Sequence, residues 1–158
     1  MEVSVRSARL TDVDAAVRLI TQSMADSGTQ REDADRLRHL LFVPAATVVV
    51  ALAERRLVGV GVLSIRPSVR SGPFIGVVEE LGIVGEGEGG SAGQADDTVL
   101  RGEAASRLLA QLIASARNKG CSRVEVTDPL ASAEPALLEQ AGFEQRGALM
   151  SRAIGLNG

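Results

Sequence analysis

The stretch from Val99 to Gly120, VLRGEAASRLLAQLIASARNKG, carries the longest regular hydrophobic pattern in this chain. Its apolar residues recur at intervals of three and four, which places them on one stripe of an α-helix. The stripe consists of Ala105, Leu108, Leu109, Leu112, Ile113 and Ala116. Gly120 follows Arg117 and Lys119, and a glycine after basic residues is typical of a helix C-terminus. The sequence therefore predicts a long amphipathic helix that ends at Gly120.

A strand, a glycine-rich loop and a helix follow one another here, which is an order typical of sites for phosphate-bearing cofactors. Residues 81–84 are an apolar run that favours the end of a strand. Residues 85–97 contain five glycines and four acidic residues, which predicts a surface loop. Phosphate groups often bind where such a loop leads into a helix, because the first helical N–H groups point at the ligand. Gly85, Gly87 and Gly90 also match a dinucleotide fingerprint, but no helix is expected to begin at Gly90, which argues against that function.

Composition excludes several classes of function. The 158 residues are 45% hydrophobic and 23% charged, which is ordinary for one globular domain. The net charge of -3 lacks the basic excess that nucleic-acid binding needs. Tyr and Trp are absent, and His39 and Cys121 are the only residues of their kinds. We therefore expect no internal disulfide and no metal site. No apolar run approaches the length of a membrane span, and we expect a cytoplasmic protein.

The rest of the chain predicts one mixed α/β domain over residues 1–158. Runs rich in β-branched residues predict strands. Strands are expected at residues 2–8, 47–53, 57–65, 74–84 and 122–127, with one or two closing strands in residues 144–154. Further helices are expected at residues 13–24, 30–41 and 133–141.

Four segments of the sequence have the order and spacing of a known family. They are residues 5–8 with Asp12, residues 79–84, the long helix with Leu108 and Leu109, and residues 137–138 followed by residues 142–143. In this order the sequence resembles the GNAT superfamily of acyl-CoA N-acyltransferases over nearly its whole length. The resemblance implies a GNAT-like fold, with a central mixed, mostly antiparallel sheet flanked by about four helices.

The resemblance also implies how the co-substrate acetyl-CoA would bind. The strand that ends at residues 83–84 would part from the strand at residues 124–127, and acyl-CoA would lie in the gap, with its pyrophosphate at the entrance of the long helix. The acceptor, a small-molecule or peptide amine, would approach from the opposite side. The residues that the resemblance assigns to the cofactor are Ile83, Val84, Arg101, Gly102, Glu103, Ala104 and Ala105.

Three residues depart from the family's pattern. Leu100 and Glu103 stand where the family has a basic residue and a glycine in its pyrophosphate motif. A Cβ there restricts the approach of backbone to phosphate, and two like charges 4 Å apart repel by about 4 kcal/mol at an effective dielectric of 20. Glu103 could instead stabilise the dipole of the helix. Leu138 stands where many members have a tyrosine that protonates the leaving thiolate.

Glu79 and Glu80 are the candidates for a general base. A carboxylate can take the proton of an acceptor amine directly or through water. Because side chains alternate along a strand, we expect one of the two to face the cleft and the other to face the core. The sequence does not choose between them, and both could instead be surface acids at a bulge or a sheet edge.

Three functional hypotheses follow from these observations. The first is an N-acetyltransferase that moves an acetyl group from acetyl-CoA to an unidentified primary amine by direct attack. The second, which Leu100, Glu103 and Leu138 favour, is a catalytically impaired GNAT-fold binding or regulatory module. The third is a fold that serves assembly alone, as a homodimer through the closing strands. None of them involves nucleic acid or a membrane.

Overall fold

The strands of the chain form one mixed sheet in which the spatial order follows the sequence order. The computed structural model describes residues 2–22, 30–85, 94–147 and 150–154. The strands are β1 (Val3–Ser7), β2 (Ala46–Ala53), β3 (Arg56–Pro67), β4 (Phe74–Ile83) and β5 (Cys121–Val126), in the order β1-β2-β3-β4-β5. The first three pairings are antiparallel, whereas β4 and β5 run parallel. This mixed, mostly antiparallel sheet confirms the predicted fold class.

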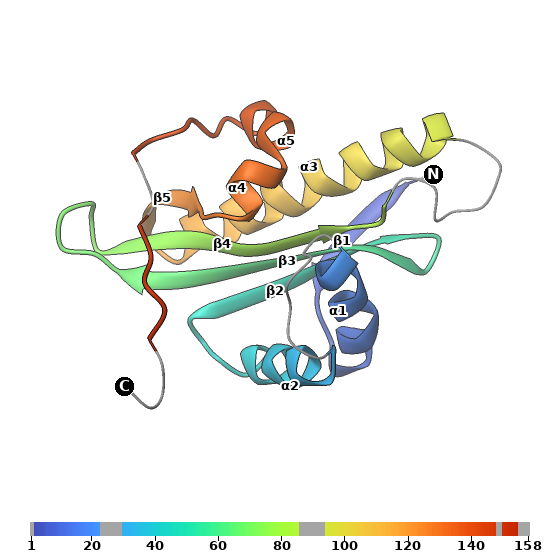
Figure 1. Cartoon of the computed structure of the whole chain (residues 1–158), viewed down its shortest axis with the longest axis horizontal. Coiled ribbons are helices and arrows are strands. Elements are labelled where there is room, and N and C mark those ends of the chain that lie inside the picture. Colours follow the sequence, from blue (N-terminus) through green and yellow to red (C-terminus); the bar gives the residue numbers. More distant parts are fainter. Residues whose placement is uncertain (1, 23–29, 86–93, 148–149, 155–158) are drawn as a thin grey trace.

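Helices cover both faces of the sheet. They are the 3-10 turn η1 (Leu10–Asp12) and the α-helices α1 (Val13–Gln22), α2 (Gln30–Leu40), α3 (Gln94–Asn118), α4 (Leu130–Ala133) and α5 (Pro135–Gln140). Helices α1 and α2 lie on one side of the sheet, and α3, α4 and α5 lie on the other (Figure 1). The parallel step from β4 to β5 passes through α3, as a parallel connection requires a crossover.

The hydrophobic stripe of α3 packs directly onto glycines of β3. A Cβ on Gly59 would lie 2.7 Å from Cδ1 of Leu108, and a Cβ on Gly61 would lie 2.9 Å from Cδ1 of Leu112. Both leucines are completely buried. Each such leucine stabilises the fold by about 1.5–3 kcal/mol through burial alone. The predicted stripe is therefore the main contact between the long helix and the sheet.

Two predicted helix boundaries are wrong. Helix α3 begins at Gln94, so residues 94–97 are helical and not part of a loop; residues 86–93 of the predicted loop lie outside the described residues. The helix expected at residues 133–141 is divided into α4 and α5, because Glu134 leaves the helical region (φ -131°, ψ 52°) and Pro135 starts a new helix.

The predicted closing strands are absent from the described part of residues 144–154. Residues 144–147 and 150–154 are irregular, and residues 148–149 lie outside the described residues. The side chains of Met150 and Ile154 are 93% and 91% exposed. A segment that buries neither face has no packing to select a strand register.

The β2–β3 hairpin contains two non-glycine residues with positive φ. Glu54 and Arg55 have φ values of 50° and 70°. This conformation favours Asn-Gly at the two turn positions. The double substitution Glu54→Asn with Arg55→Gly should therefore raise the free energy of unfolding by about 1–2 kcal/mol. Urea denaturation checks this, with Arg55→Ala as the control, because alanine removes the charge but keeps the Cβ. Equal stability of the double variant and the wild type would contradict the account.

The contact between β4 and α1 depends on Gly82. A Cβ at this position would lie 2.8 Å from the backbone nitrogen of Ile20, an atom that only a shift of α1 can move away. We expect Gly82→Ala to lower the free energy of unfolding by about 1–3 kcal/mol. Gly102→Ala is the matched control, because a Cβ there meets no atom within 4 Å and alanine favours a helix by about 1 kcal/mol. The two alanine variants should thus change the melting temperature in opposite directions.

Candidate functional site

Strands β4 and β5 are paired only over the first half of β4. Their Cα partners run from Phe74 and Cys121 to Val78 and Val126, where β5 ends. Strand β4 continues to Ile83. Beyond Val78, the edge of β4 on the β5 side has no strand partner among the described residues. We call the gap that opens there the wedge; an extended ligand with amide groups can hydrogen-bond to such a strand edge.

A β-bulge lies at the point where the two strands part. Val62 of β3 is opposite Glu80, and the next residue, Leu63, is opposite Val78. Glu79 is therefore the extra residue of β4. A bulge bends its strand and increases the local twist. This bend explains why β4 leaves the direction of β5 at this position.

The bulge also places Glu79 and Glu80 on the same face of the sheet. Gly82 faces α1, and Glu80, two residues earlier, shares that face. Ser64 faces away from α3, because its neighbour Leu63 packs on the α3 side, and its hydroxyl donates a 2.6 Å hydrogen bond to Oε1 of Glu79. The expectation that the two carboxylates would face opposite sides is therefore wrong, because the extra residue interrupts the alternation.

Glu80 has the electrostatic properties of a weakly acidic carboxyl group. The side chain of Glu80 is half-buried, and this burial raises its pKa; repulsion from Glu79 and from Asp33 in the first turn of α2 raises it further. A carboxylate with a raised pKa accepts a proton near neutral pH more readily than an ordinary one. Of the two predicted candidates for a general base, Glu80 is thus the one that burial favours, whereas Glu79 is exposed and hydrogen-bonded to Ser64.

The wedge contains a small pocket of about 170 Å³. We call it the wedge pocket; its lining residues come from β4, α3 and the α4–α5 region, which lie next to one another in Figure 1. They are Glu80, Leu81, Ile83, Arg101, Leu130, Ala133 and Glu134. An ion pair crosses the pocket, in which Nη2 of Arg101 donates to Oε1 of Glu134. Nη1 of Arg101 is buried without a hydrogen-bond partner in the described part of the chain.

Only some of the predicted cofactor residues border this pocket. Ile83 and Arg101 line it, whereas the N–H group of Val84 donates to the carbonyl of Val58 at 2.9 Å. Because α3 begins at Gln94, residues 101–105 lie inside the helix, and their N–H groups have intrahelical partners. The free N–H groups of the helix belong to its first turn, several residues earlier than predicted.

Two residues that depart from the family's pattern contribute to packing. Leu100 is 7% exposed and Leu138 is 5% exposed, and both belong to the hydrophobic core. Glu103 forms an ion pair with Arg107 one helical turn away, with 3.2 Å between Oε1 and Nε. These contacts account for the residue types at all three departures without a cofactor.

The sequence analysis missed Glu134 and Asp33 as members of the site. Both lie far from β4 in the sequence, and no motif marks them. The dipeptide Glu134-Pro135 is the one available signal, because a residue before proline favours the end of a helix. Such an end would have indicated that the side chain of Glu134 lies at the junction of two helices.

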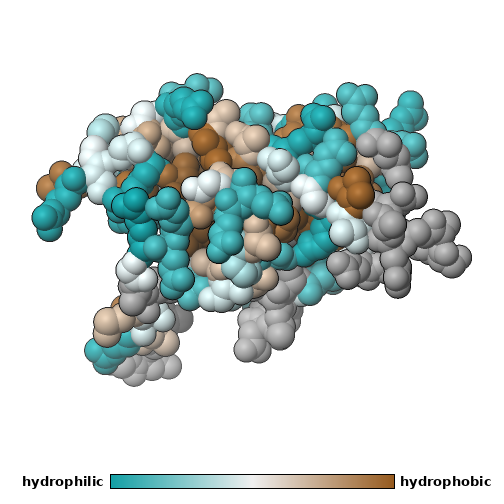
Figure 2. All heavy atoms as spheres, turned by 90° about the horizontal axis from the view of Figure 1, so that it is seen from above, coloured by the Kyte–Doolittle hydropathy of each residue, from teal (hydrophilic) through white to brown (hydrophobic). Residues whose placement is uncertain are grey.

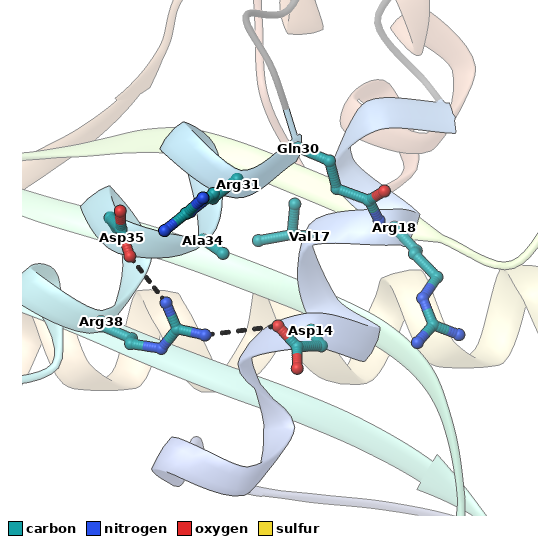
Figure 3. A pocket seen from close by; sticks show the side chains of 8 residues that line it. All are labelled: Asp14, Val17, Arg18, Gln30, Arg31, Ala34, Asp35 and Arg38. Carbon is teal, nitrogen blue, oxygen red and sulfur yellow. Dashed lines mark hydrogen bonds and ion pairs between the residues drawn. The ribbon is translucent and has the colours of Figure 1, made fainter.

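A second hollow lies between α1 and α2. It has a volume of about 530 Å³, and its lining is mostly charged. Figure 3 shows Arg38 between two carboxylates, with distances of 3.4 Å to Asp14 and 2.8 Å to Asp35. The guanidinium of Arg18 is directed away from this cluster (Figure 3). The charges of the hollow are thus partly paired within it, and its groups do not converge on one point.

Other residue types offer no further chemistry in the described residues. His39 is exposed, and burial raises the pKa of the Cys121 thiol, which makes it a poor nucleophile. No group of three or more His, Cys, Asp or Glu residues able to hold a metal ion is present in residues 2–22, 30–85, 94–147 and 150–154. Within the same ranges, no helix combines the length and the apolar character needed to cross a membrane.

The fold has close counterparts among solved structures, although no protein-family model and no curated protein sequence matches the chain. Aminoglycoside N-acetyltransferase AAC(6')-Iy in complex with CoA is similar with a TM-score of 0.75 and 17% identity, over 97% of this chain and 95% of that one. Glucosamine-6-phosphate N-acetyltransferase from Arabidopsis thaliana is similar with a TM-score of 0.71 and 15% identity, over 98% and 100% of the two chains.

A protein described as a transcriptional regulator, from Bacillus halodurans C-125, is similar to the same degree. Its TM-score is 0.71 at 16% identity, over 97% of this chain and 100% of that one. At these low identities the likeness is one of fold. The fold of this chain is that of the GNAT acetyltransferases.

Proposed function

We propose that this chain is an acyl-CoA-dependent N-acyltransferase of the GNAT type, which transfers an acetyl group from acetyl-CoA to a primary amine. The observation that carries the proposal is the wedge, where the unpaired edge of β4 and the carboxylates of the bulge lie at the same position of the sheet. The fold shared with two N-acetyltransferases, one of them in complex with CoA, supports the proposal.

In this proposal the extended arm of acetyl-CoA lies along the edge of β4. Its amide groups hydrogen-bond to the strand edge beyond Val78, up to Ile83 and Val84. Arg101, which already lines the wedge pocket, binds a phosphate group of the co-substrate. Residues 102–105 stay predicted cofactor contacts, although their N–H groups are used within the helix and the side chains of Ala104 and Ala105 are completely buried.

The reaction is a direct attack on the thioester. Glu80 takes a proton from the acceptor ammonium group, directly or through a water molecule. The free amine then attacks the carbonyl carbon, the new C–N bond forms, and the C–S bond breaks to release the thiolate of CoA. The sequence contains no tyrosine to protonate this thiolate. A thiol with a pKa near 8.5 is a tolerable leaving group. The attacking nitrogen loses its second proton to water, and water returns a proton to the thiolate.

The acceptor in this proposal is a cationic small-molecule or peptide amine. Glu79 and Glu80 share the face of the sheet that α1 and α2 cover, and Asp33 is close enough to raise the pKa of Glu80. Asp33 already pairs with Arg36 at 3.1 Å, so Glu79 and Glu80 are the carboxylates that favour a positively charged substrate. Three structural neighbours are named as aminoglycoside N-acetyltransferases, which supports an amine of low molecular mass. The cytoplasmic location and the homodimer stay predictions.

A second candidate is a GNAT-fold module that binds a ligand without turning it over. Glu103 and the missing tyrosine favour it, and one structural neighbour is described as a transcriptional regulator. Assembly alone is less well supported. The described residues contain no closing strands, and hydrophobic residues on the face seen in Figure 2 are interspersed with hydrophilic ones.

Release of CoA from acetyl-CoA in the presence of a panel of polyamines and amino sugars tests the proposal. We expect the wild type to release thiol, and Glu80→Gln to reduce kcat/KM by about 100-fold or more, because the base is lost. Glu79→Gln should reduce kcat/KM by less than about tenfold. Acetyl-CoA binding without thiol release for any amine would favour the second candidate. Equal rates for Glu80→Gln and the wild type would exclude Glu80 as the base.

The raised pKa of Glu80 predicts the position of the acid limb of the pH–rate profile. A base must be ionised to act, so kcat/KM falls as the pH falls through the pKa of Glu80, which lies above the value of about 4.3 for an ordinary glutamate. Glu79→Gln removes a repulsive charge and should move this limb to lower pH. Glu144→Gln, which removes an exposed carboxylate outside the sheet, should leave it in place. An acid limb that Glu79→Gln does not move would contradict the electrostatic account.

A further inference from the structure

The ion pair between Arg101 and Glu134 lies in a pocket, unlike the exposed ion pairs of this protein. It joins α3 to the junction of α4 and α5 across the wedge pocket. The two side chains are 24% and 26% exposed, so both charges are largely removed from water. A pair in such surroundings is screened less by salt than a surface pair.

The backbone of Glu134 is fixed, so that only its side chain is free to move. Its N–H group donates to the carbonyl of Leu130 at 3.1 Å, which ends α4. Its carbonyl accepts from the N–H group of Leu138 at 3.2 Å, which starts α5. The carboxylate is therefore presented to α3 by a rigid junction, and rotation of one side chain is sufficient to withdraw it.

Arg101 has donor capacity that Glu134 does not use. A guanidinium offers five N–H donors. Nη2 donates to Glu134, whereas Nη1 is buried and has no partner among the described residues. A buried donor without a partner costs free energy, and an anion that entered the pocket would supply the missing acceptor. The pocket thus holds a cation that one internal carboxylate satisfies only in part.

We propose that Glu134 is a latch on the wedge: its carboxylate occupies Arg101 until an anionic group of the co-substrate displaces it. This inference rests on the proposed function and adds a residue to it. Glu134 and a phosphate group compete for one guanidinium, and they repel each other if both stay. Binding of acyl-CoA therefore includes the opening of the ion pair, and the affinity of the free protein is lowered by the fraction of closed molecules.

If Glu134 is such a latch, replacing its carboxylate should strengthen the binding of acetyl-CoA. Glu134→Gln keeps the size of the side chain but removes the competing charge. We expect it to bind acetyl-CoA about five- to tenfold more tightly than the wild type in isothermal titration calorimetry, because the competitor is gone. Arg101→Gln should bind at least about tenfold more weakly, since it lacks the cation. A residue that only supports the fold would weaken binding when it is replaced.

Two further measurements make the test specific. The double variant Arg101→Gln with Glu134→Gln should lose the higher affinity for acetyl-CoA that Glu134→Gln confers, because this increase in affinity acts through Arg101. Inorganic diphosphate, as a probe without the pantetheine arm, should also bind Glu134→Gln more tightly than the wild type. Glu144→Gln is the matched control, because it removes one carboxylate from an exposed pair with Arg146 and should leave both affinities unchanged.

The outcomes separate this inference from the function on which it rests. If the wild type binds acetyl-CoA and Glu134→Gln binds it equally or more weakly, the latch is wrong and the proposed function stands. A gain that persists in the double variant also overturns the latch. If no variant binds acetyl-CoA or diphosphate, both the latch and the proposed function fail.

Discussion

The extra residue in β4 is the constraint on which the rest of the site depends. In a regular antiparallel pair, Leu63 and Val62 would face consecutive residues of β4; instead they face Val78 and Glu80. The resulting bend ends the pairing between β4 and β5 at Val78 and exposes the edge of β4. The same insertion brings Glu79 and Glu80 to one face. One backbone irregularity thus produces both the gap for a co-substrate and the carboxylates for an acceptor.

Close packing around the bulge holds this irregularity in place. On one face, Leu108 and Leu112 of α3 fill the space above Gly59 and Gly61 of β3. On the other face, the backbone of α1 lies directly over Gly82. Because neither helix can approach so closely over larger side chains, the glycines fix the distance between the layers. The wedge is therefore a rigid feature of the sheet, and the Arg101–Glu134 pair is the part of its wall that can open by side-chain rotation.

The sequence predicted the elements that depend on long hydrophobic patterns. The stripe of α3 and the β-branched runs of β2 and β3 are regular over two or more turns or pleats, so tertiary packing reinforces the local preference. No closing strand is present in the described residues of 144–154, where Met150 and Ile154 find no buried position. The start of α3 was also predicted wrongly, because the glycine-rich and acidic composition of residues 85–97 was interpreted as one loop, whereas the helix begins at Gln94.

The candidate site was predictable only in part. Ile83 and Arg101, which the resemblance assigned to the cofactor, both line the wedge pocket, but their contact with a cofactor stays a prediction. A bulge at Glu79 and Glu80 was left as an open alternative, and their common face was not predicted, because no residue type in the sequence selects a bulge over regular alternation. Glu134 and Asp33 were missed because they reach the site through tertiary structure alone. Leu100, Glu103 and Leu138, which weaken the family's pattern, have contacts in the core or on α3 that explain them.

Amide hydrogen exchange with and without acetyl-CoA tests the central claim, that the wedge between β4 and β5 is the binding site. The account predicts that acetyl-CoA slows exchange in residues 79–84 and 127–134, on both sides of the wedge, because a bound ligand pairs with the free strand edge and closes the pocket. Unchanged exchange in these segments at saturating acetyl-CoA, or slowing confined to the hollow between α1 and α2, would contradict the account.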